Sequence, residues 1–184
     1  MVDDRLETLS DLLASRAIPL GLVAEGDGER VRERHVEDSL RAAPLLGTGV
    51  VVDIGSGAGL PGIPLAIARP DLSFVLVEPK RRAVAFLELA LQELGLVNVE
   101  VRHARIEEVA LEADAATARA FGPLDRSWAA ACRVLKPGGR LIYFAGSSWD
   151  PAEAQALTKP ESPAGTEVSE LESSAPLVIM TREE

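Results

Sequence analysis

The segment at residues 50–66, VVVDIGSGAGLPGIPLA, constrains the fold more than any other. Its first residues form an unbroken apolar run up to Asp53, which predicts a buried parallel strand. Within eight positions it then holds four glycines: Gly55, Gly57, Gly59 and Gly62. Residues 62–70 predict a helix, because Pro64 falls in its first turn, where a proline removes no helical hydrogen bond. The glycines therefore predict a tight strand-to-helix loop whose backbone a ligand approaches closely.

The rest of the chain alternates between strand and helix patterns. Helices are predicted at 3–15, 29–46, 80–95 and 123–135, with a glycine-rich break at 21–29 and a tight turn, KPGG, at 136–139. Strands are predicted at 72–78, 97–104, 116–121 and 140–146, followed by a closing pair at 166–172 and 176–181. This order predicts an α/β fold with a doubly wound, mostly parallel seven-stranded sheet and an antiparallel edge strand.

Length and composition favour one compact domain at 47–184, preceded by a short helical segment at 1–46. The 184 residues are 47% hydrophobic and 26% charged, and no run approaches the ~20 apolar residues that span a bilayer. The acidic, amphipathic N-terminus differs from signal and transit peptides. Cys132 is the single cysteine and there are two histidines, so we expect no disulfide and no structural metal. We therefore expect a cytoplasmic protein.

The formal net charge of −10 argues mildly against a nucleic-acid partner. The charge is uneven, however, because residues 150–184 carry eight acidic and two basic residues and so account for −6 of it. Arginines cluster in ERVRERH, PKRR and VRHAR, which leaves room for a local basic surface.

The strand, the glycine loop and the next strand together predict a ligand site. Glu78 ends the second strand, about twenty residues after the loop, where an acid binds ribose hydroxyls in folds of this kind. A merely structural turn is the alternative, although four glycines exceed what a turn requires. Asp53 precedes the glycines as D-x-G-x-G-x-G, which suits a cationic amino group and a sulfonium better than a pyrophosphate. The predicted ligand is therefore S-adenosylmethionine, as in class I methyltransferases.

Four segments carry a more specific resemblance: RHVEDSL at 34–40, the run from VDIGSG to AVAFL at 52–87, ARIEE at 104–108 and ARAF at 118–121. Over residues 31–145 the chain closely resembles the bacterial small-subunit ribosomal RNA methyltransferase G family, also called glucose-inhibited division protein B. The resemblance implies methyl transfer from S-adenosylmethionine to N7 of one guanine in 16S ribosomal RNA. The implied partner is that RNA or the small ribosomal subunit.

The resemblance also assigns residues to the cofactor. Glu78 binds the ribose, Ile106 and Glu107 flank the adenine, and Arg119 borders both the cofactor and the incoming base. The methionine moiety is lined by the loop residues Gly55, Gly57, Gly59 and Leu60. The candidates for phosphate contacts are Arg34, Lys80, Arg81, Arg82 and Arg105.

Each of these roles has a structural alternative. Ile106 is also compatible with a core position, Arg81 and Arg82 with a solvated helix start, and Arg119 with a structural ion pair. His35 is better suited to a helix-packing or capping role than to the role of a base.

The chemistry of guanine N7 agrees with the residues that are present. N7 has a lone pair and no proton, so the enzyme needs no general base and has only to align N7 with the methyl carbon. The sequence offers no base beside the fourth strand and lacks the Asn/Asp-Pro-Pro-aromatic segment that would hold an exocyclic amine. Cys132 falls inside a predicted helix, away from the place of a nucleophile that attacks a pyrimidine C6.

Three departures from the family remove groups expected near RNA. Residues 18–29 replace a longer aromatic region, Ala145 stands before Gly146 where the family has lysine, and the C-terminus reads MTREE instead of carrying lysines. We therefore expect weaker RNA binding than in the relatives. Two alternatives stay open: a methyltransferase with another acceptor, and a cofactor-binding module that has lost RNA methylation. We expect a monomer.

Overall fold

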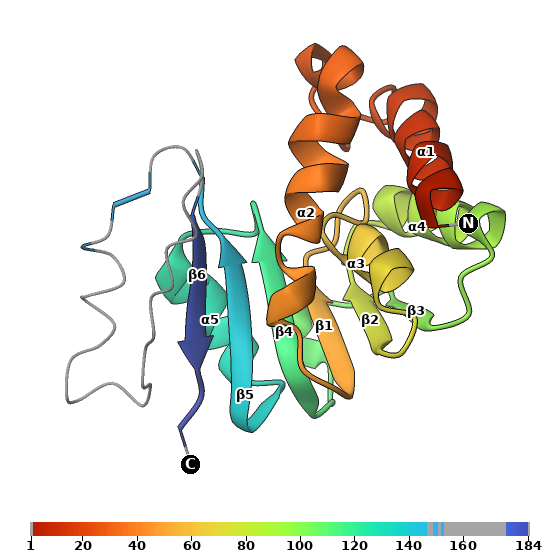
Figure 1. Ribbon diagram of the computed structural model, residues 1–184. Helices are drawn as coiled ribbons and strands as arrows, with labels where there is room; N and C mark the ends of the chain where they lie inside the picture. Colours follow the sequence, from red (N-terminus) through yellow and green to blue (C-terminus); the bar gives the residue numbers. More distant parts are fainter. Residues whose placement is uncertain (1, 147–148, 151, 153–175, 184) are drawn as a thin grey trace.

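The computed structural model describes residues 2–146, 149–150, 152 and 176–183. Within these residues one six-stranded sheet has the order β3-β2-β1-β4-β5-β6 (Figure 1). The strands are β1 (Val50–Ile54), β2 (Ser73–Val77), β3 (Val99–Arg102), β4 (Ala113–Arg119), β5 (Leu135–Phe144) and β6 (Leu177–Thr181). All neighbours pair in parallel except β5 and β6, which are antiparallel. This confirms the predicted α/β fold with a doubly wound, mostly parallel sheet and an antiparallel edge strand.

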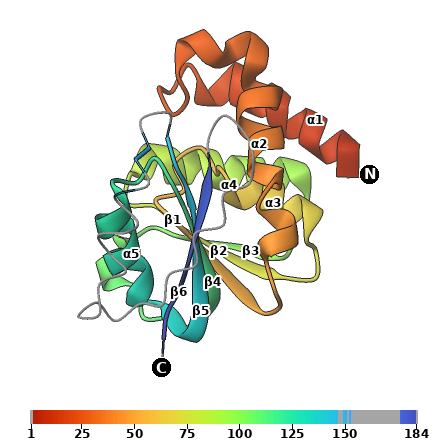
Figure 2. The ribbon, with the colours of Figure 1, turned by 60° about the vertical axis from the view of Figure 1, so that its left-hand side comes forward.

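Helices cover both faces of the sheet (Figure 2). One face carries α1 (Val2–Leu12), α3 (Gly62–Ala68) and α4 (Arg81–Leu94), and the other carries α5 (Leu124–Cys132). Gly95 ends α4 in the left-handed region, with φ of +60°, as the sequence predicts. The remaining helical turns are η1 (Leu13–Ala17), η2 (Glu25–Arg30), η3 (Arg32–Glu37), α2 (Asp38–Leu40), η4 (Ala43–Leu45) and η5 (Ile106–Glu108).

The predicted count of seven strands is wrong for the described part of the chain, which holds six. The additional strand was assigned to 166–172, which lies outside the described residues, as does most of the loop predicted at 146–165. Of the closing pair, β6 is therefore the one strand that the structure shows, and it pairs with β5.

The predicted turn at 136–139 is also wrong, because these residues lie inside β5. The register shifts between the pairs Ala113–Leu135 and Ala115–Arg140, so the extra residues of β5 bulge out of the ladder. Gly138, with φ of +79°, supplies the left-handed residue that this bulge requires. A local Pro-Gly-Gly pattern thus marks a bend within a strand here.

The single helix predicted at 29–46 is broken into η2, η3, α2 and η4, and it begins inside the predicted glycine-rich break. Pro44 carries no N–H group and cannot continue an α-helical ladder, so the last turn is a 3₁₀ turn. At the start, the buried carboxylate of Asp27 bonds to His35 and Arg34, which holds η2 against η3.

Successive residues of the central strands point to opposite faces of the sheet, and they are buried on both. Val52 and Ala116 belong to the core beside α5, whereas Val51 and Ala115 belong to the core that includes Leu65 of α3. A parallel sheet covered on both sides explains why the strands read as continuous apolar runs.

The N-terminal segment shares a core with the sheet domain. Leu9 of α1 and Leu13 of η1 are fully buried in one cluster with Ile63 of α3 and Leu87 of α4. Within the described residues, no helix has both the length and the apolar character needed to cross a membrane.

We expect Leu9→Ala to lower the free energy of unfolding by about 2–5 kcal/mol, because it opens a cavity between α1 and the sheet domain. Urea unfolding followed by circular dichroism measures the change. Val97→Ala is the control, since the Val97 side chain is 99% exposed and its loss should cost less than about 0.5 kcal/mol. A cost below about 1 kcal/mol for Leu9→Ala would show that α1 adds little to the stability of the domain.

Candidate active site

Parallel strands bring several predicted site residues to one edge of the sheet. The carboxyl ends of β1, β2 and β4 lie side by side, with Ile54 paired to Val77 on one side and to Ala118 on the other. The glycine loop, Glu78 and Arg119 therefore leave the sheet at the same level. This edge is where open α/β sheets bind ligands.

The glycine loop has a backbone that requires glycine. Gly55, Gly57 and Gly59 have φ values of +71°, +54° and +80°. At Gly59 a Cβ atom would lie 2.4 Å from Cδ1 of Ile63, so the turn also packs tightly against α3. At Gly57 the nearest atom to a Cβ would be the Gly55 carbonyl oxygen at 3.9 Å. The loop thus presents open backbone at Gly57.

Glu78 joins the end of β2 to this loop. Its side chain is buried, and Oε2 accepts a hydrogen bond of 2.9 Å from the Gly57 N–H group. The other oxygen, Oε1, accepts one of 2.8 Å from the Lys80 N–H group. The Gly55 and Ser56 N–H groups donate to the Val77 carbonyl oxygen. The carboxylate is thereby held at the loop, where its remaining lone pairs can accept bonds from a ligand.

Asp53 lies beneath the loop rather than at its surface. Its side chain is 1% exposed, and Oδ1 accepts a 2.8 Å hydrogen bond from the Thr117 hydroxyl of β4. Oδ2 has no hydrogen-bond partner among the described residues. Burial raises the pKa of Asp53 to about 6, although the bond from Thr117 favours the ionised form. Its close packing leaves no room for a side chain at Gly62, where a Cβ atom would lie 2.9 Å from Oδ2.

Arg119 reaches from β4 to the N-terminal helical turns. Its guanidinium donates to the carbonyl oxygens of Arg34 at 2.9 Å and His35 at 3.3 Å, and it lies 3.3 Å from Oδ2 of Asp38. Burial lowers the pKa of Arg119, while the charge of Asp38 opposes this shift. The structure therefore shows the ion pair that the sequence left open as an alternative, beside the glycine loop.

His35 connects Arg119 to Asp27. Its Nδ1 accepts from Arg119 at 3.1 Å, so Nε2 carries the proton and donates to Asp27 Oδ2 at 2.9 Å. The bond from His35 holds the pKa of Asp27 below its usual range. Every polar atom of the His35 ring has a structural partner, which fits the predicted packing role better than that of a base.

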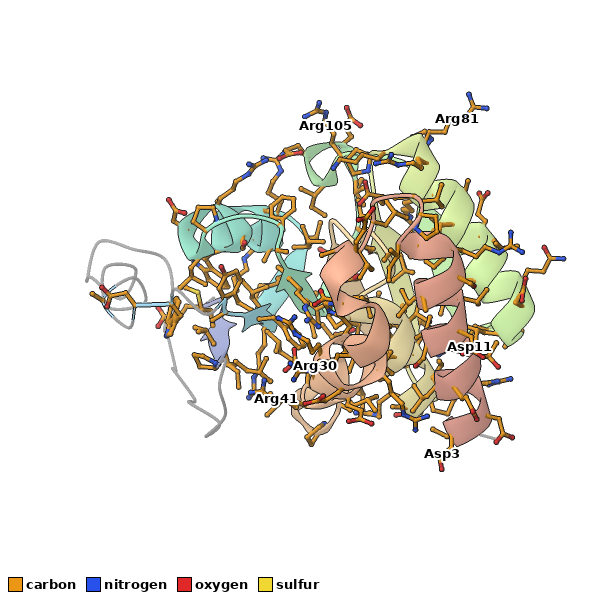
Figure 3. All side chains as sticks on the ribbon, turned by 90° about the horizontal axis from the view of Figure 1, so that it is seen from above. Asp3, Asp11, Arg30, Arg41, Arg81 and Arg105 are labelled. Atoms are coloured by element: carbon orange, nitrogen blue, oxygen red, sulfur yellow. The ribbon has the colours of Figure 1, made fainter. Side chains whose placement is uncertain are left out.

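The other predicted residues lie at the same edge but differ in exposure. Ile106 is buried in the core beside α5, whereas Glu107 is exposed, and Leu60 is half-buried in the loop. The basic side chains at the ends of β2 and β3 are exposed: Lys80, Arg81, Arg82 and Arg105. Figure 3 looks down on this edge and shows Arg81 and Arg105 projecting outward on the same side. Arg34 differs, because it is paired with Asp27.

Sequence reasoning missed two residues of this edge, Thr117 and Phe121. Thr117 stands directly opposite Asp53 in the β1–β4 register, so it was within reach of an argument from strand pairing. Phe121 follows Arg119 by two residues, in the segment ARAF, and its ring lies against Gly55. Only the fold brings this ring to the loop.

The fold and the glycine-loop site define a class of protein. The structure is similar to a magnesium protoporphyrin IX methyltransferase from Synechocystis PCC 6803, solved with bound SAM, with a TM-score of 0.68 over 97% of each chain. At 12% identity this likeness concerns the fold alone. The fold is that of the class I S-adenosylmethionine-dependent methyltransferases.

The family follows from the sequence comparisons. The family model described as GidB, rRNA small subunit methyltransferase G, matches residues 3–176, and the chain belongs to this family. A ribosomal RNA small subunit methyltransferase G from Clavibacter sepedonicus is 48% identical over 138 residues, which are 74% of this chain and 65% of the relative. Its counterpart from Clavibacter michiganensis subsp. michiganensis (strain NCPPB 382) is 44% identical over 161 residues, 85% of this chain and 76% of that relative. The chain thus spans about two thirds to three quarters of the length of these two relatives.

The raised pKa of Asp53 predicts a pH dependence of stability. An unfolded aspartate titrates near 3.8, so ionisation of Asp53 disfavours the folded state as the pH rises from about 4 to above 6. Asp53→Asn removes this ionisation and keeps an oxygen for the Thr117 bond. Relative to wild type, the variant should gain up to about 3 kcal/mol in unfolding free energy between pH 4 and pH 7.5.

Urea unfolding of both proteins at several pH values measures this difference. Asp11→Asn changes an exposed carboxylate of α1 and serves as the control, with an expected effect below about 0.5 kcal/mol throughout. Parallel pH curves for wild type and Asp53→Asn would contradict the raised pKa.

Proposed function

We propose that this chain transfers a methyl group from S-adenosylmethionine to N7 of one guanine in 16S ribosomal RNA. Membership of the rRNA small subunit methyltransferase G family supports the acceptor. The class I methyltransferase fold supports the methyl donor. The site itself supplies the observation that carries the proposal: an open glycine loop held by the carboxylate of Glu78 from the next strand.

The residues present fit S-adenosylmethionine. Open space at Gly57 admits a ligand to within contact of the backbone. The Glu78 carboxylate, fixed by two N–H groups, suits the two hydroxyls of a ribose, which are donors. Ile106 and the exposed Glu107 follow β3 at the same edge and would flank the adenine. Asp53 lies below the loop, so we assign it a supporting role rather than a direct contact.

The reaction needs alignment more than proton transfer. S-adenosylmethionine, when bound, supplies a methyl group attached to a sulfonium sulfur. The rest of the molecule leaves as a neutral thioether. The N7 lone pair forms the new bond to the methyl carbon while the electrons of the sulfur–carbon bond stay on sulfur, and the positive charge passes to the guanine. No proton moves, which agrees with a site whose His35 is fully engaged by Asp27 and Arg119. Holding N7 in line is then the main contribution of the protein.

We infer that Arg119 borders the cofactor and the incoming base. It follows Ala118, which pairs with Ile54, so it stands next to Gly55 at the edge of the sheet. Its bonds to the backbone of residues 34–35 and to Asp38 support a positioning role: they hold the N-terminal turns over this edge. Removal of the Arg119 side chain would break its bonds to the backbone of residues 34–35 and its ion pair with Asp38.

The exposed side chains of Lys80, Arg81, Arg82 and Arg105 are our candidates for RNA phosphates. They lie beside the proposed cofactor site, and none of them forms an ion pair with a carboxylate within the described residues. Unpaired cations are available for phosphates without the loss of an existing bond. The basic edge is small, so we expect binding to depend on ribosomal shape as well as on charge.

The decisive experiment incubates the protein with methyl-labelled S-adenosylmethionine and small ribosomal subunits from a strain that lacks its own enzyme. Cleavage at N7-methylguanine then maps the product. Label at a single guanine is the expected result. Label on another acceptor, or no label with cofactor binding intact, would refute the proposal and favour one of the two alternative functions.

Glu78→Gln tests the ribose contact. The amide group would place an N–H donor against the Gly57 or Lys80 N–H group and would remove an acceptor for the ribose. We expect S-adenosylmethionine to bind at least ten-fold more weakly, about 1.4 kcal/mol or more, as measured by calorimetry. Glu88→Gln makes the same change at an exposed position of α4 and should leave the affinity unchanged. Equal affinities for wild type and Glu78→Gln would remove Glu78 from the site.

A further inference from the structure

The loop that joins β4 to α5 has an unusual backbone at the carboxyl edge. Ala120 has φ of +53°, and within the described residues it is the one position other than glycine with a positive φ. An L-residue in this region is strained, so its neighbours must hold it there. The consequence is a sharp change of direction directly after Arg119, which places Phe121 over the glycine loop.

Phe121 lies against the loop itself. A Cβ atom at Gly55 would stand 2.7 Å from Cδ2 of the ring and 3.5 Å from Cε2. The ring therefore rests on the bare backbone of Gly55, and any side chain there would displace it. Gly57, two residues further along, has open space above it. Phe121 thus stands at the boundary of the proposed cofactor site.

The ring packs against the core beside α5 but is less buried than the other phenylalanine rings. The chain has four phenylalanines, and the other three are 1%, 2% and 6% exposed, whereas Phe121 is only half-buried. The Arg126 guanidinium, from the exposed side of α5, lies over the ring at 5.1 Å from its centroid. A half-buried aromatic ring and the guanidinium above it therefore lie together at the edge of the proposed site.

The loop that carries the ring is held firmly. The Gly122 carbonyl oxygen accepts hydrogen bonds from the Tyr143 hydroxyl at 3.1 Å and from the Ser127 hydroxyl at 3.3 Å. Pro123 then begins the turn into α5. Two bonds to one carbonyl fix the backbone next to Phe121, so the ring is presented in a defined place.

We propose that Phe121 and Arg126 form a stacking platform for the target guanine, which sets N7 beside the methyl donor. This inference rests on the proposed function and adds positioning residues for its acceptor. Unpaired RNA bases stack on phenylalanine rings and on arginine guanidinium planes. Stacking holds a base by its face and leaves its edge free, which is what attack by N7 requires. The Gly55 contact fixes the platform relative to the donor.

A set of three variants tests the platform in the methylation assay. Phe121→Leu keeps apolar volume but removes the aromatic face, and Phe121→Tyr restores it. Phe86→Leu makes the same change in the core, since Phe86 is 2% exposed on α4. Melting curves identify losses that come from stability alone.

For Phe121→Leu we expect kcat/KM for small ribosomal subunits to fall roughly five- to a hundred-fold, the range of one base–aromatic stack. Its Kd for S-adenosylmethionine should stay within about two-fold of wild type. Phe121→Tyr should retain wild-type kcat/KM within about three-fold, and Phe86→Leu should lose stability without this fall. Wild-type activity in Phe121→Leu, equal losses in the Leu and Tyr variants, or a matching loss of cofactor affinity would each overturn the platform.

A binding measurement keeps this proposal separate from the proposed function. Fluorescence anisotropy compares a labelled single-stranded RNA that carries one guanine among uridines with the same RNA in which the guanine is an abasic site. The platform predicts that wild type binds the guanine RNA at least five-fold more tightly, and that Phe121→Leu and Arg126→Ala reduce this preference. Equal binding of both RNAs by wild type overturns the platform even where methylation succeeds. A guanine preference that depends on Phe121, without methylation of subunits, supports the platform while refuting the proposed function.

Discussion

Parallel pairing of β1 with β2 on one side and β4 on the other is the constraint on which the site depends. The register places Ile54 level with Val77 and Ala118, so the residues that follow each strand leave the sheet together. The glycine loop, Glu78 and Arg119 are far apart in sequence and adjacent at this edge for that reason alone. Helices cover both faces of the sheet (Figure 1), and open α/β sheets bind their ligands at the carboxyl edge of the strands.

Two acidic side chains serve this edge in different ways. Glu78 accepts bonds from the Gly57 and Lys80 N–H groups, so its charge is compensated by the loop that it holds. Asp53 is more deeply buried, with one bond from Thr117 and an oxygen that lacks a partner within the described residues. Burial of this carboxylate is costly and raises its pKa, and the polar groups of Thr117, Ser56 and the Gly62 backbone oppose the shift only in part. The hydrogen bond between Thr117 and Asp53 also joins β4 to β1 directly beneath the loop.

The parts of the site that were predictable are those encoded by short local patterns. Alternation of strands and helices predicted the fold class, and the D-x-G-x-G-x-G pattern with Glu78 predicted the centre of the candidate site, where the structure joins Glu78 to the loop. Both patterns depend on residues close in sequence. The break-up of the helix predicted at 29–46 was not predictable, since it reflects contacts of Asp27 with His35 and of Arg119 with residues 34–38. The bulge inside β5 was misread as a turn because its glycines signal a bend without saying whether the strand continues.

The sequence by itself determined the class of fold, the open glycine loop and the acid at the end of the next strand, because periodicity and glycine spacing act over a few residues. The tertiary structure decided which of those residues are buried and which lie open at the carboxyl edge. It buried Asp53 and Ile106, tied Arg119 to the N-terminal turns, and brought Phe121 onto Gly55 from a position more than sixty residues away. These outcomes follow from strand register and from packing on both faces of the sheet. Register and packing each depend on residues from several segments of the chain, so no single segment predicts them.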